Sequence, residues 1–237
     1  MKLAIVGYGT VGQATQRTLK KGFMNDTEFV IHDPDKNLNG TWKDADIIFI
    51  CTPTDNVKEY LDAVPQEKHH DIIIRSTIDF AILGDEFMSA GVWPEFLTER
   101  TWFEDSRNPI CNVFGGSIKQ LEVLNTITIF DNFYHTTPKI AALMKVATNS
   151  FYTMKVTFAN ILKDIAGENY HELQKTLEQD PRMAADIHFQ VPGPDGQYGY
   201  GGKCFPQNLD MFGNFSTSAY MLASTIEKLN EKYRSKK

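Results

Sequence analysis

Short apolar runs separated by longer segments of mixed polarity fill the first half of the chain. The runs at residues 46–50 and 71–75 are rich in Ile, and each of them follows a polar segment. Unbroken apolar runs of this kind are typical of parallel strands that helices cover on both faces. The pattern predicts an α/β fold with a doubly wound parallel sheet, a Rossmann domain, over residues 1–136. The predicted strands are residues 2–6, 28–32, 46–50, 71–75 and 110–114, and the predicted helices are residues 10–20 and 118–125.

A different pattern begins in the second half of the chain. Residues 139–166 contain neither Gly nor Pro, and they lie between Thr137-Pro138 and Gly167, which are typical start and stop signals of a helix. A helix of this length would extend about 42 Å. Its apolar residues cover more than one narrow stripe, so it needs packing partners on two sides. We therefore predict an all-helical second domain over residues 137–237, built on this helix, and a homodimer that uses its surface.

The composition is that of a globular protein, with 237 residues, of which 42% are hydrophobic and 23% charged. A net charge of -6 argues against a surface that neutralises the phosphates of a nucleic acid. No apolar segment approaches a membrane span or the apolar region of a signal peptide, so we expect a cytoplasmic protein without a membrane partner. The three cysteines form no CxxC pair, which argues against a disulfide scaffold, and we expect no metal site.

A GxGxxG motif directly follows the first predicted strand and opens the first predicted helix. In this context the glycines permit a tight turn, close approach of a pyrophosphate and close packing of helix and strand. Asp33 lies 21 residues beyond Gly12, where a carboxylate binds the ribose 2′-hydroxyl and favours NAD over NADP. The alternatives are a glycine turn that binds no nucleotide and, at Lys36, contact with a 2′-phosphate. The motif consists of Gly7, Tyr8, Gly9, Thr10, Val11 and Gly12.

Further polar residues follow the third and fourth predicted strands, at the edge where such sheets bind ligands. Glu95 and Glu99 then lie in a segment bounded by aromatic residues, and either carboxylate is a candidate general base. Lys145 and Asn149 share one face of the long helix and are candidate donors to an oxyanion, the alternative being an ordinary exposed helix edge. The residues after the two strands are Thr52, Pro53, Thr54, Ser76 and Thr77.

Cys204 lies at the end of a glycine-rich loop, just ahead of a predicted helix. The helix start and the neighbouring Lys203 both favour the thiolate, which is the nucleophilic form of a cysteine. The loop glycines indicate close approach of the backbone to a ligand. The alternative is a small buried residue in a tight turn, and buried structural roles are our interpretation of Cys51 and Cys111.

Together these motifs resemble the UDP-glucose 6-dehydrogenase and GDP-mannose dehydrogenase family, in order and spacing, over nearly the whole chain. The resemblance implies an NAD-dependent, four-electron oxidation of the primary alcohol of a nucleotide sugar to a carboxylate, with a UDP-sugar preferred to a GDP-sugar as substrate. The most specific segment is GYGGKCFP at residues 199–206. The other matching segments are GYGTVG at 7–12, TPT at 52–54, ST at 76–77, PEFLTE at 94–99 and Lys145-x-x-x-Asn149.

The resemblance also implies a role for each matching residue. Cys204 would capture the aldehyde as a thiohemiacetal and hold a thioester after the second hydride transfer. Lys145 and Asn149 would stabilise oxyanions, and Glu95 would act as acid and base with a water held by Thr77. The resemblance places Glu99 near the nicotinamide, and Phe96, Leu97, Tyr200, Gly201 and Gly202 at the sugar-nucleotide site.

The sequence departs from the family pattern at several positions. Asn208 replaces an aspartate, Arg100 replaces a glycine, and Lys203 replaces the serine before the cysteine. The sequence also ends 33 residues after Cys204, where the family continues into a further domain, so a partner subunit would have to complete the nucleotide pocket or the substrate would bind weakly. Two other functions stay open: a single-oxidation dehydrogenase of the 3-hydroxyacid or 6-phosphogluconate type, and a catalytically lapsed NAD-binding partner protein.

Overall fold

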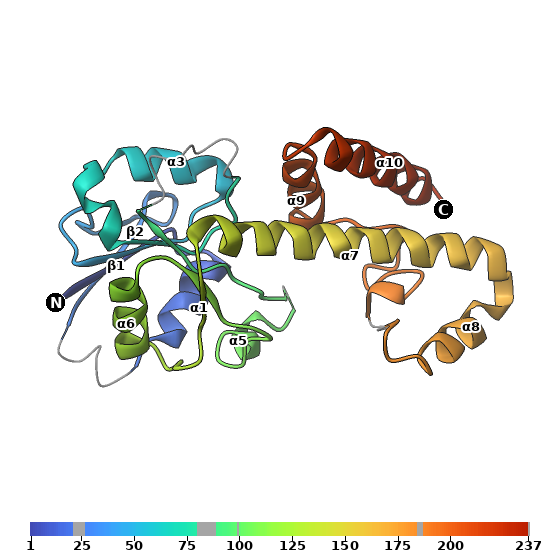
Figure 1. Cartoon of the computed structure of the whole chain (residues 1–237), viewed down its shortest axis with the longest axis horizontal. Coiled ribbons are helices and arrows are strands. Elements are labelled where there is room, and N and C mark those ends of the chain that lie inside the picture. The colour runs from blue at the N-terminus through green and yellow to red at the C-terminus, as the bar shows by residue number, and fades with distance from the viewer. Residues whose placement is uncertain (21–26, 80–88, 99, 184–186, 237) are drawn as a thin grey trace. The chain divides into compact units, whose positions relative to one another are not determined.

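Figure 1 shows the computed structural model, which describes residues 1–20, 27–79, 89–98, 100–183 and 187–236. The chain divides into two compact units, Met1–Lys145 and Val146–Lys237. The division falls inside the long helix and not before it, because the first turns of that helix pack on the sheet of the first unit. In the part of the chain that the structure describes, no helix is both long and apolar enough to cross a membrane.

Among the described residues, eight strands of the first unit form one sheet in the order β3-β2-β1-β4-β5-β6-β7-β8. Neighbours from β2 to β6 run parallel, whereas β3 is antiparallel to β2, and β7 is antiparallel to β6. Because β1 has β2 on one side and β4 on the other, the order reverses at β1, and ligands of such sheets bind beyond its carboxyl end. The strands are β1 (Lys2–Val6), β2 (Glu28–Asp33), β3 (Leu38–Asn39), β4 (Ile47–Ile50), β5 (Ile72–Ile74), β6 (Gly91–Val92), β7 (Val113–Gly115) and β8 (Tyr134–Thr136).

Both faces of this sheet are covered, as the unbroken apolar strands require. Successive side chains of a strand point to opposite faces, so Ile48 and Ile50 of β4 enter one core and Phe49 enters the other. Helix α3 and the first turns of α7 cover the first face, and α1 and α6 cover the second (Figure 1). The doubly wound α/β fold is therefore confirmed. The helices are α1 (Thr10–Thr18), α3 (Thr54–Asp62), α5 (Trp102–Asp105), α6 (Ile118–Ile127) and α7 (Pro138–Ala166).

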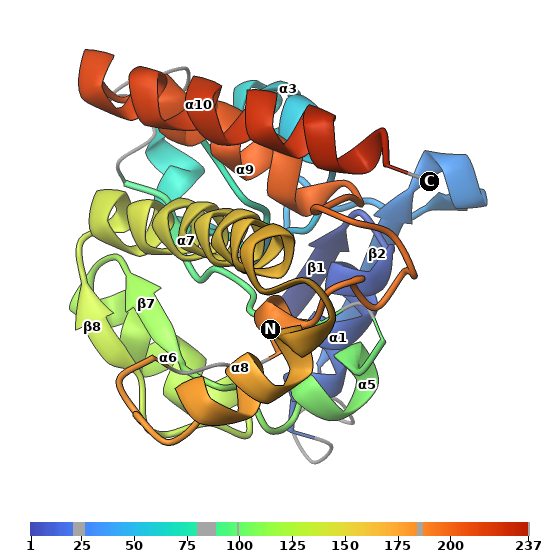
Figure 2. The same ribbon diagram turned by 90° about the vertical axis from the view of Figure 1, so that its right-hand side faces the viewer.

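The described residues of the second unit contain helices and no strand, which confirms an all-helical part built on α7. Helices α9 and α10 pack against each other and enclose a small core with Tyr200 (Figure 2). Two asparagines hold the glycine-rich loop: Asn160 Oδ1 accepts a hydrogen bond from Gly199 N, and Asn230 exchanges two hydrogen bonds with the backbone of Tyr200. The helices that follow α7 are α8 (Tyr170–Leu177), α9 (Cys204–Gly213) and α10 (Thr217–Arg234).

The hydrophobic pattern missed the shortest elements. β3, β6 and β8 have two or three residues each, too few to show a period, and α5 has four. The pattern also did not reveal α3 and α8. Helix α9 begins at Cys204 itself and not beyond it, and it includes Pro206 because proline is tolerated in the first turn of a helix.

Candidate active site

The turn between β1 and α1 has room for an anion at its second glycine. Gly7 adopts φ +84°, and a Cβ there would lie 2.8 Å from the backbone of Cys51. A Cβ at Gly9, in contrast, would meet nothing within 4 Å. The first glycine is therefore required by the fold, while the second faces open space, as close approach of a pyrophosphate demands.

The first turn of α1 leaves its backbone N–H groups available. Gly9 is the N-cap residue, no side chain caps the helix, and the first turn carries no acidic residue. Unsatisfied N–H groups and the helix dipole favour a negative charge at this position. Thr10 and Val11, which belong to the predicted motif, form the start of this turn.

Asp33 lies beside the glycine turn, as the motif spacing predicts. Its Oδ2 accepts a hydrogen bond from Tyr8 N at 2.7 Å, and the ammonium of Lys36 lies 4.0 Å from the same oxygen. Lys36 also donates to Tyr8 O, so it braces the turn. The carboxylate is thus fixed at the end of β2, where it can accept a hydrogen bond from a ribose hydroxyl.

The polar residues after β4 and β5 meet at the same edge of the sheet. Ser76 Oγ donates to Thr52 O at 2.6 Å, and Thr54 Oγ1 donates to Thr77 O at 2.9 Å. Pro53 is the N-cap residue of α3 between them. The hydroxyl of Thr52 is buried and has no hydrogen-bond partner among the described residues. An unsatisfied buried hydroxyl next to the glycine turn fits a polar ligand such as a dinucleotide.

Two sequence-predicted catalytic residues form a buried ion pair in the first unit. Lys145 Nζ lies 3.1 Å from Glu95 Oε1, with side-chain exposures of 6% and 12%. Glu95 Oε2 accepts a hydrogen bond from Leu97 N at 2.7 Å, and the ring of Phe96 lies 5.3 Å from the ammonium. Both carboxylate oxygens are therefore held in place. Glu99, the other predicted carboxylate, lies outside the described residues.

The second unit places Cys204 at the first position of α9, where its side chain is exposed. One turn later, Asn208 is buried, and its Nδ2 donates to Cys204 O at 2.9 Å while its Oδ1 has no hydrogen-bond partner among the described residues. Ser150 Oγ donates to Asn208 O at 3.3 Å, which ties α9 to α7 directly beside the buried Asn149. The cysteine thus lies at the start of a helix that is joined to α7 at Ser150, the residue after the predicted Asn149.

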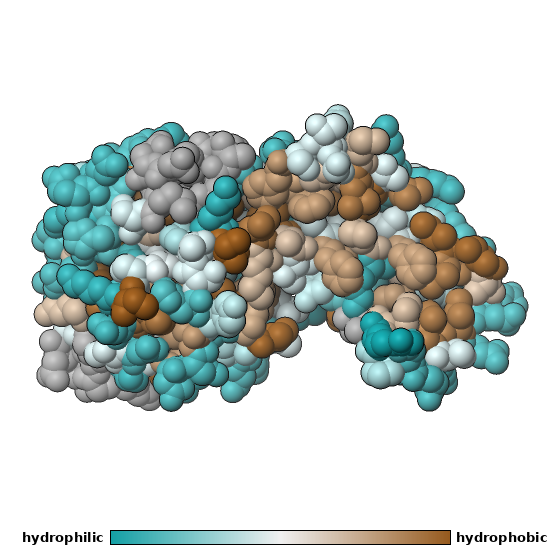
Figure 3. Space-filling view, in the orientation of Figure 1, coloured by the Kyte–Doolittle hydropathy of each residue, from teal (hydrophilic) through white to brown (hydrophobic). Residues whose placement is uncertain are grey.

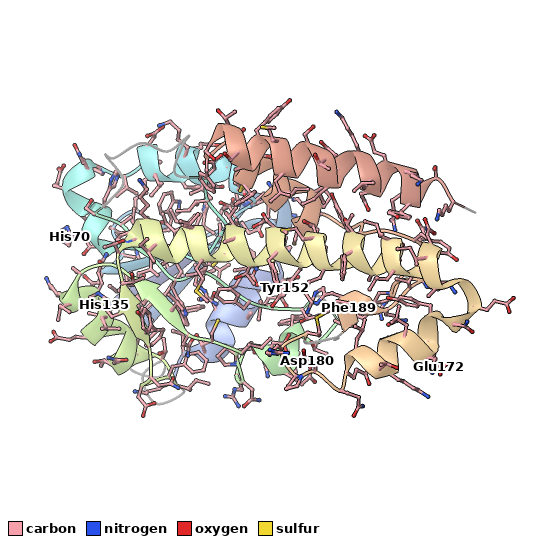
Figure 4. The ribbon with its side chains drawn as sticks, turned by 45° about the vertical axis from the view of Figure 1, so that its right-hand side comes forward. His70, His135, Tyr152, Glu172, Asp180 and Phe189 are labelled. Atoms are coloured by element: carbon pink, nitrogen blue, oxygen red, sulfur yellow. The ribbon has the colours of Figure 1, made fainter. Side chains whose placement is uncertain are left out.

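Aromatic rings surround Phe205, the residue after the cysteine, and among them sequence analysis identified Tyr200 but not Tyr152 or His188. The ring of Phe205 lies 6.3 Å from Tyr152 and from Tyr200, and 6.0 Å from His188. The rings of Tyr152 and His188 stack with their centroids 4.1 Å apart, and Figure 4 labels Tyr152 on α7 together with Phe189, the residue after His188. Tyr152 lies one helical turn beyond Asn149, which was a usable signal, whereas nothing in the local sequence marks His188. Gly201 and Gly202 lie in the loop that leads to these rings.

The three cysteines differ sharply in accessibility. Cys51 is buried at the end of β4, and burial raises the pKa of its thiol to about 11. Cys111 is half-buried in a loop, and burial raises its pKa as well, although the charge of Lys145 opposes this. Cys204 is exposed. Only the last of these environments suits a nucleophile that a substrate must reach.

Comparison with known proteins agrees with these local features. Residues 139–232 match the model of the UDP-glucose/GDP-mannose dehydrogenase family, central domain. GDP-mannose 6-dehydrogenase of Pseudomonas aeruginosa is 25% identical over 202 residues, which cover 70% of this chain and 45% of that protein. The chain therefore spans less than half the length of this relative. The resemblance to the family is confirmed.

Solved structures similar in fold include two classes of dehydrogenase. A UDP-glucose dehydrogenase from the archaeon Pyrobaculum islandicum has a TM-score of 0.70 and 19% identity, covering 98% of this chain and 68% of that one. A 3-hydroxyisobutyrate dehydrogenase from Mycobacterium tuberculosis has a TM-score of 0.65 and 14% identity, covering 98% and 94%. At these identities the likeness shows a shared fold.

Proposed function

Because the chain is related to the UDP-glucose/GDP-mannose dehydrogenase family, we propose that it oxidises the primary alcohol of a nucleotide sugar to a carboxylate with NAD. The observation that carries the proposal is the buried Lys145–Glu95 pair in the unit that also forms the dinucleotide cradle. A buried charge pair costs desolvation free energy, and a carboxylate and an ammonium held together near a ligand-binding turn can serve proton transfer and oxyanion stabilisation. A UDP-sugar is the preferred substrate class, as the resemblance implies.

The residues of the first unit would serve binding and proton transfer. The turn at Gly9 and the first turn of α1 would hold the pyrophosphate, and Asp33 would bind the adenosine ribose. NAD, when bound, supplies the hydride acceptor for each of the two oxidations. Lys145 would stabilise negative charge on the substrate oxygen, and Glu95 would accept and return a proton through a water held by Thr77.

The residues of the second unit would retain the aldehyde between the two oxidations. The Cys204 thiolate would attack the aldehyde carbon to form a thiohemiacetal, whose oxidation gives a thioester. Water would then hydrolyse the thioester and release the carboxylate and the thiol. Asn149 would donate a hydrogen bond to the oxyanion, and Tyr200, Gly201 and Gly202 would contact the sugar.

Release of NADH on addition of single substrates tests this function. The substrates are UDP-glucose, UDP-N-acetylglucosamine, UDP-galactose, GDP-mannose and 6-phosphogluconate, each at saturating NAD. We expect turnover with one nucleotide sugar at least. Turnover with 6-phosphogluconate alone would instead support a single-oxidation enzyme, and no turnover with any substrate would support a lapsed NAD-binding protein.

A single-oxidation dehydrogenase is the second candidate. The observation that favours it is the fold match itself, because a 3-hydroxyisobutyrate dehydrogenase structure matches 98% of this chain with a TM-score of 0.65. The exposed Cys204 at the start of α9 favours the nucleotide-sugar reaction, since a single oxidation needs no thiol.

Cofactor preference is the first prediction. With the Asp33 carboxylate held beside the glycine turn, NAD should bind at least tenfold more tightly than NADP, a difference of about 1.4 kcal/mol, because the 2′-phosphate would meet a like charge. Isothermal titration calorimetry with both nucleotides measures this difference in affinity, and Asp33→Ala should make the difference smaller. Asp35→Ala, at an exposed position two residues away, is the matched control and should leave it unchanged. Equal or reversed affinities in the unmodified protein would contradict this assignment.

Dimer formation is the second prediction. Figure 3 shows hydrophobic residues along α7 in the second unit, where Phe151 and Phe158 are 56% and 46% exposed. An exposed apolar surface of this kind is typical of an interface, so light scattering should give twice the monomer mass of 26.9 kDa. The double variant Phe151→Glu/Phe158→Glu should be monomeric, whereas Lys175→Glu on α8 should not change the mass. A monomer at micromolar concentration would refute the dimer.

A further inference from the structure

A fully buried arginine lies at the carboxyl end of β5. Arg75 follows Ile74 directly and has 4% of its surface exposed. Burial lowers its pKa to about 10, and the nearby carboxylate of Glu95 and thiol of Cys51 oppose this shift. Taking a guanidinium out of water costs several kcal/mol unless its contacts compensate, so its position calls for a specific role.

On one side, Arg75 contacts the helix that begins at the glycine turn. Its Nε donates to Thr15 Oγ1 at 3.1 Å, and the same hydroxyl donates to Val11 O at 2.8 Å. Val11 lies in the first turn of α1, where the N–H groups face the proposed pyrophosphate site. The arginine is therefore linked to the cofactor-binding turn through one buried hydroxyl.

On the other side, Arg75 contacts the segment that carries Glu95. Its Nη1 donates to Trp93 O at 2.9 Å, and its guanidinium carbon lies 3.7 Å above the centre of the Trp93 ring. Trp93 precedes Glu95 by two residues, with Pro94 between them limiting the backbone. The hydrogen bond and the cation–π contact of Arg75 both fix Trp93, and therefore the backbone next to the Lys145–Glu95 pair.

We propose that Arg75 is a positioning residue that couples the cofactor-binding helix to Glu95. Through this coupling, a cofactor that orders the glycine turn also restricts the movement of Glu95, the proton-transfer group. The coupling runs from Val11 through Thr15 and Arg75 to Trp93. It rests on the proposed function in one respect, since it takes Glu95 as the group that moves the proton. The contacts themselves do not depend on which substrate is oxidised.

Hydrogen–deuterium exchange of the segment 93–98 tests the coupling without any substrate. The reporter is Leu97 N–H, which donates to Glu95 Oε2 and exchanges only when Glu95 moves away. Arg75→Met should speed exchange of this amide at least tenfold, and Arg75→Lys, which keeps the cation, should restore part of the protection. Adding NAD should slow the exchange in the unmodified protein and have no such effect in Arg75→Met.

Arg17→Met is a matched control in the same unit. Arg17 also lies over an aromatic ring, at 3.2 Å from the centre of Phe103, and its Nε donates to Ser106 Oγ at 3.1 Å, but it leads to α5 and not to Glu95. This variant should leave exchange in segment 93–98 unchanged. If Arg75→Met does not fold, Thr15→Val removes the acceptor on the α1 side and should speed Leu97 exchange about threefold.

Two results would overturn the coupling. One is unchanged exchange at Leu97 in the Arg75 and Thr15 variants, and the other is faster exchange spread equally over β1 and β4, which indicates a purely structural role. Failure of the proposed function would give a different result. The variants would still change the exchange at Leu97 as expected, but no nucleotide sugar would lead to NADH formation. Where turnover is found, Arg75→Met should lower kcat tenfold or more while changing the dissociation constant of NAD less than threefold.

Discussion

Two molecules of NADH should be released for each molecule of nucleotide sugar oxidised, and Cys204→Ser should lose more than 99% of this turnover. The reason is that a thiolate can hold the aldehyde as a thiohemiacetal and carry the acyl group as a thioester, whereas a serine hydroxyl is not ionised at neutral pH and is a much weaker nucleophile. The stoichiometry is measured by absorbance of NADH against a limiting amount of sugar. Loss of one nucleophile typically lowers rates by several orders of magnitude.

The controls separate the chemistry from the fold. Cys204→Ser changes one exposed atom, so its NAD affinity and its melting temperature should equal those of the unmodified protein. Cys51→Ser and Cys111→Ser are matched substitutions, and both should retain the release of two NADH. Iodoacetamide should alkylate Cys204 fastest, because burial shields Cys51 and raises the pKa of both other thiols. One NADH per sugar together with an active Cys204→Ser protein would exclude the covalent route.

The dinucleotide cradle could be predicted from the sequence because its determinants are local. The glycine motif, the first helix and Asp33 belong to one strand–helix–strand unit, so spacing along the chain fixes their positions in space. The structure accordingly brings Asp33 to the backbone of Tyr8. The same reasoning predicted the long helix, whose start and stop signals both lie in the sequence.

The contacts of the candidate site could not be predicted in this way. Glu95 and Lys145 are fifty residues apart in the sequence, and their 3.1 Å contact depends on how the start of α7 packs on the sheet. The burial of Arg75 could not be predicted from the sequence. The residue follows an apolar run as at an ordinary strand end, where a charged side chain is usually exposed to solvent. Only the packing of Thr15 and Trp93 around it reveals a buried cation. Contacts between residues far apart in the sequence are therefore the part of the site that the hydrophobic pattern could not predict.

The largest stability effect is expected at the Lys145–Glu95 pair. Lys145→Met leaves a carboxylate buried without its cation, and breaking a buried pair in this way destabilises a protein by about 3 kcal/mol. Glu95→Gln leaves the ammonium without its partner and should be destabilising for the same reason. Turnover should fall at least a hundredfold in both variants, since each loses either the oxyanion donor or the proton-transfer group. Denaturant titration measures the free energy of unfolding, and NADH release measures turnover.

The double variant Lys145→Met/Glu95→Gln distinguishes the two effects. It leaves no buried charge at this position, so the free energy of unfolding should recover to within about 1 kcal/mol of the unmodified protein. Turnover should stay lost, because neither catalytic group is present. Lys58→Met breaks an exposed pair with Asp62 on α3 and should leave both quantities almost unchanged, as is usual for surface ion pairs. A double variant that regained activity along with stability would show that the pair is structural, and the assignment of Glu95 and Lys145 to catalysis would then be abandoned.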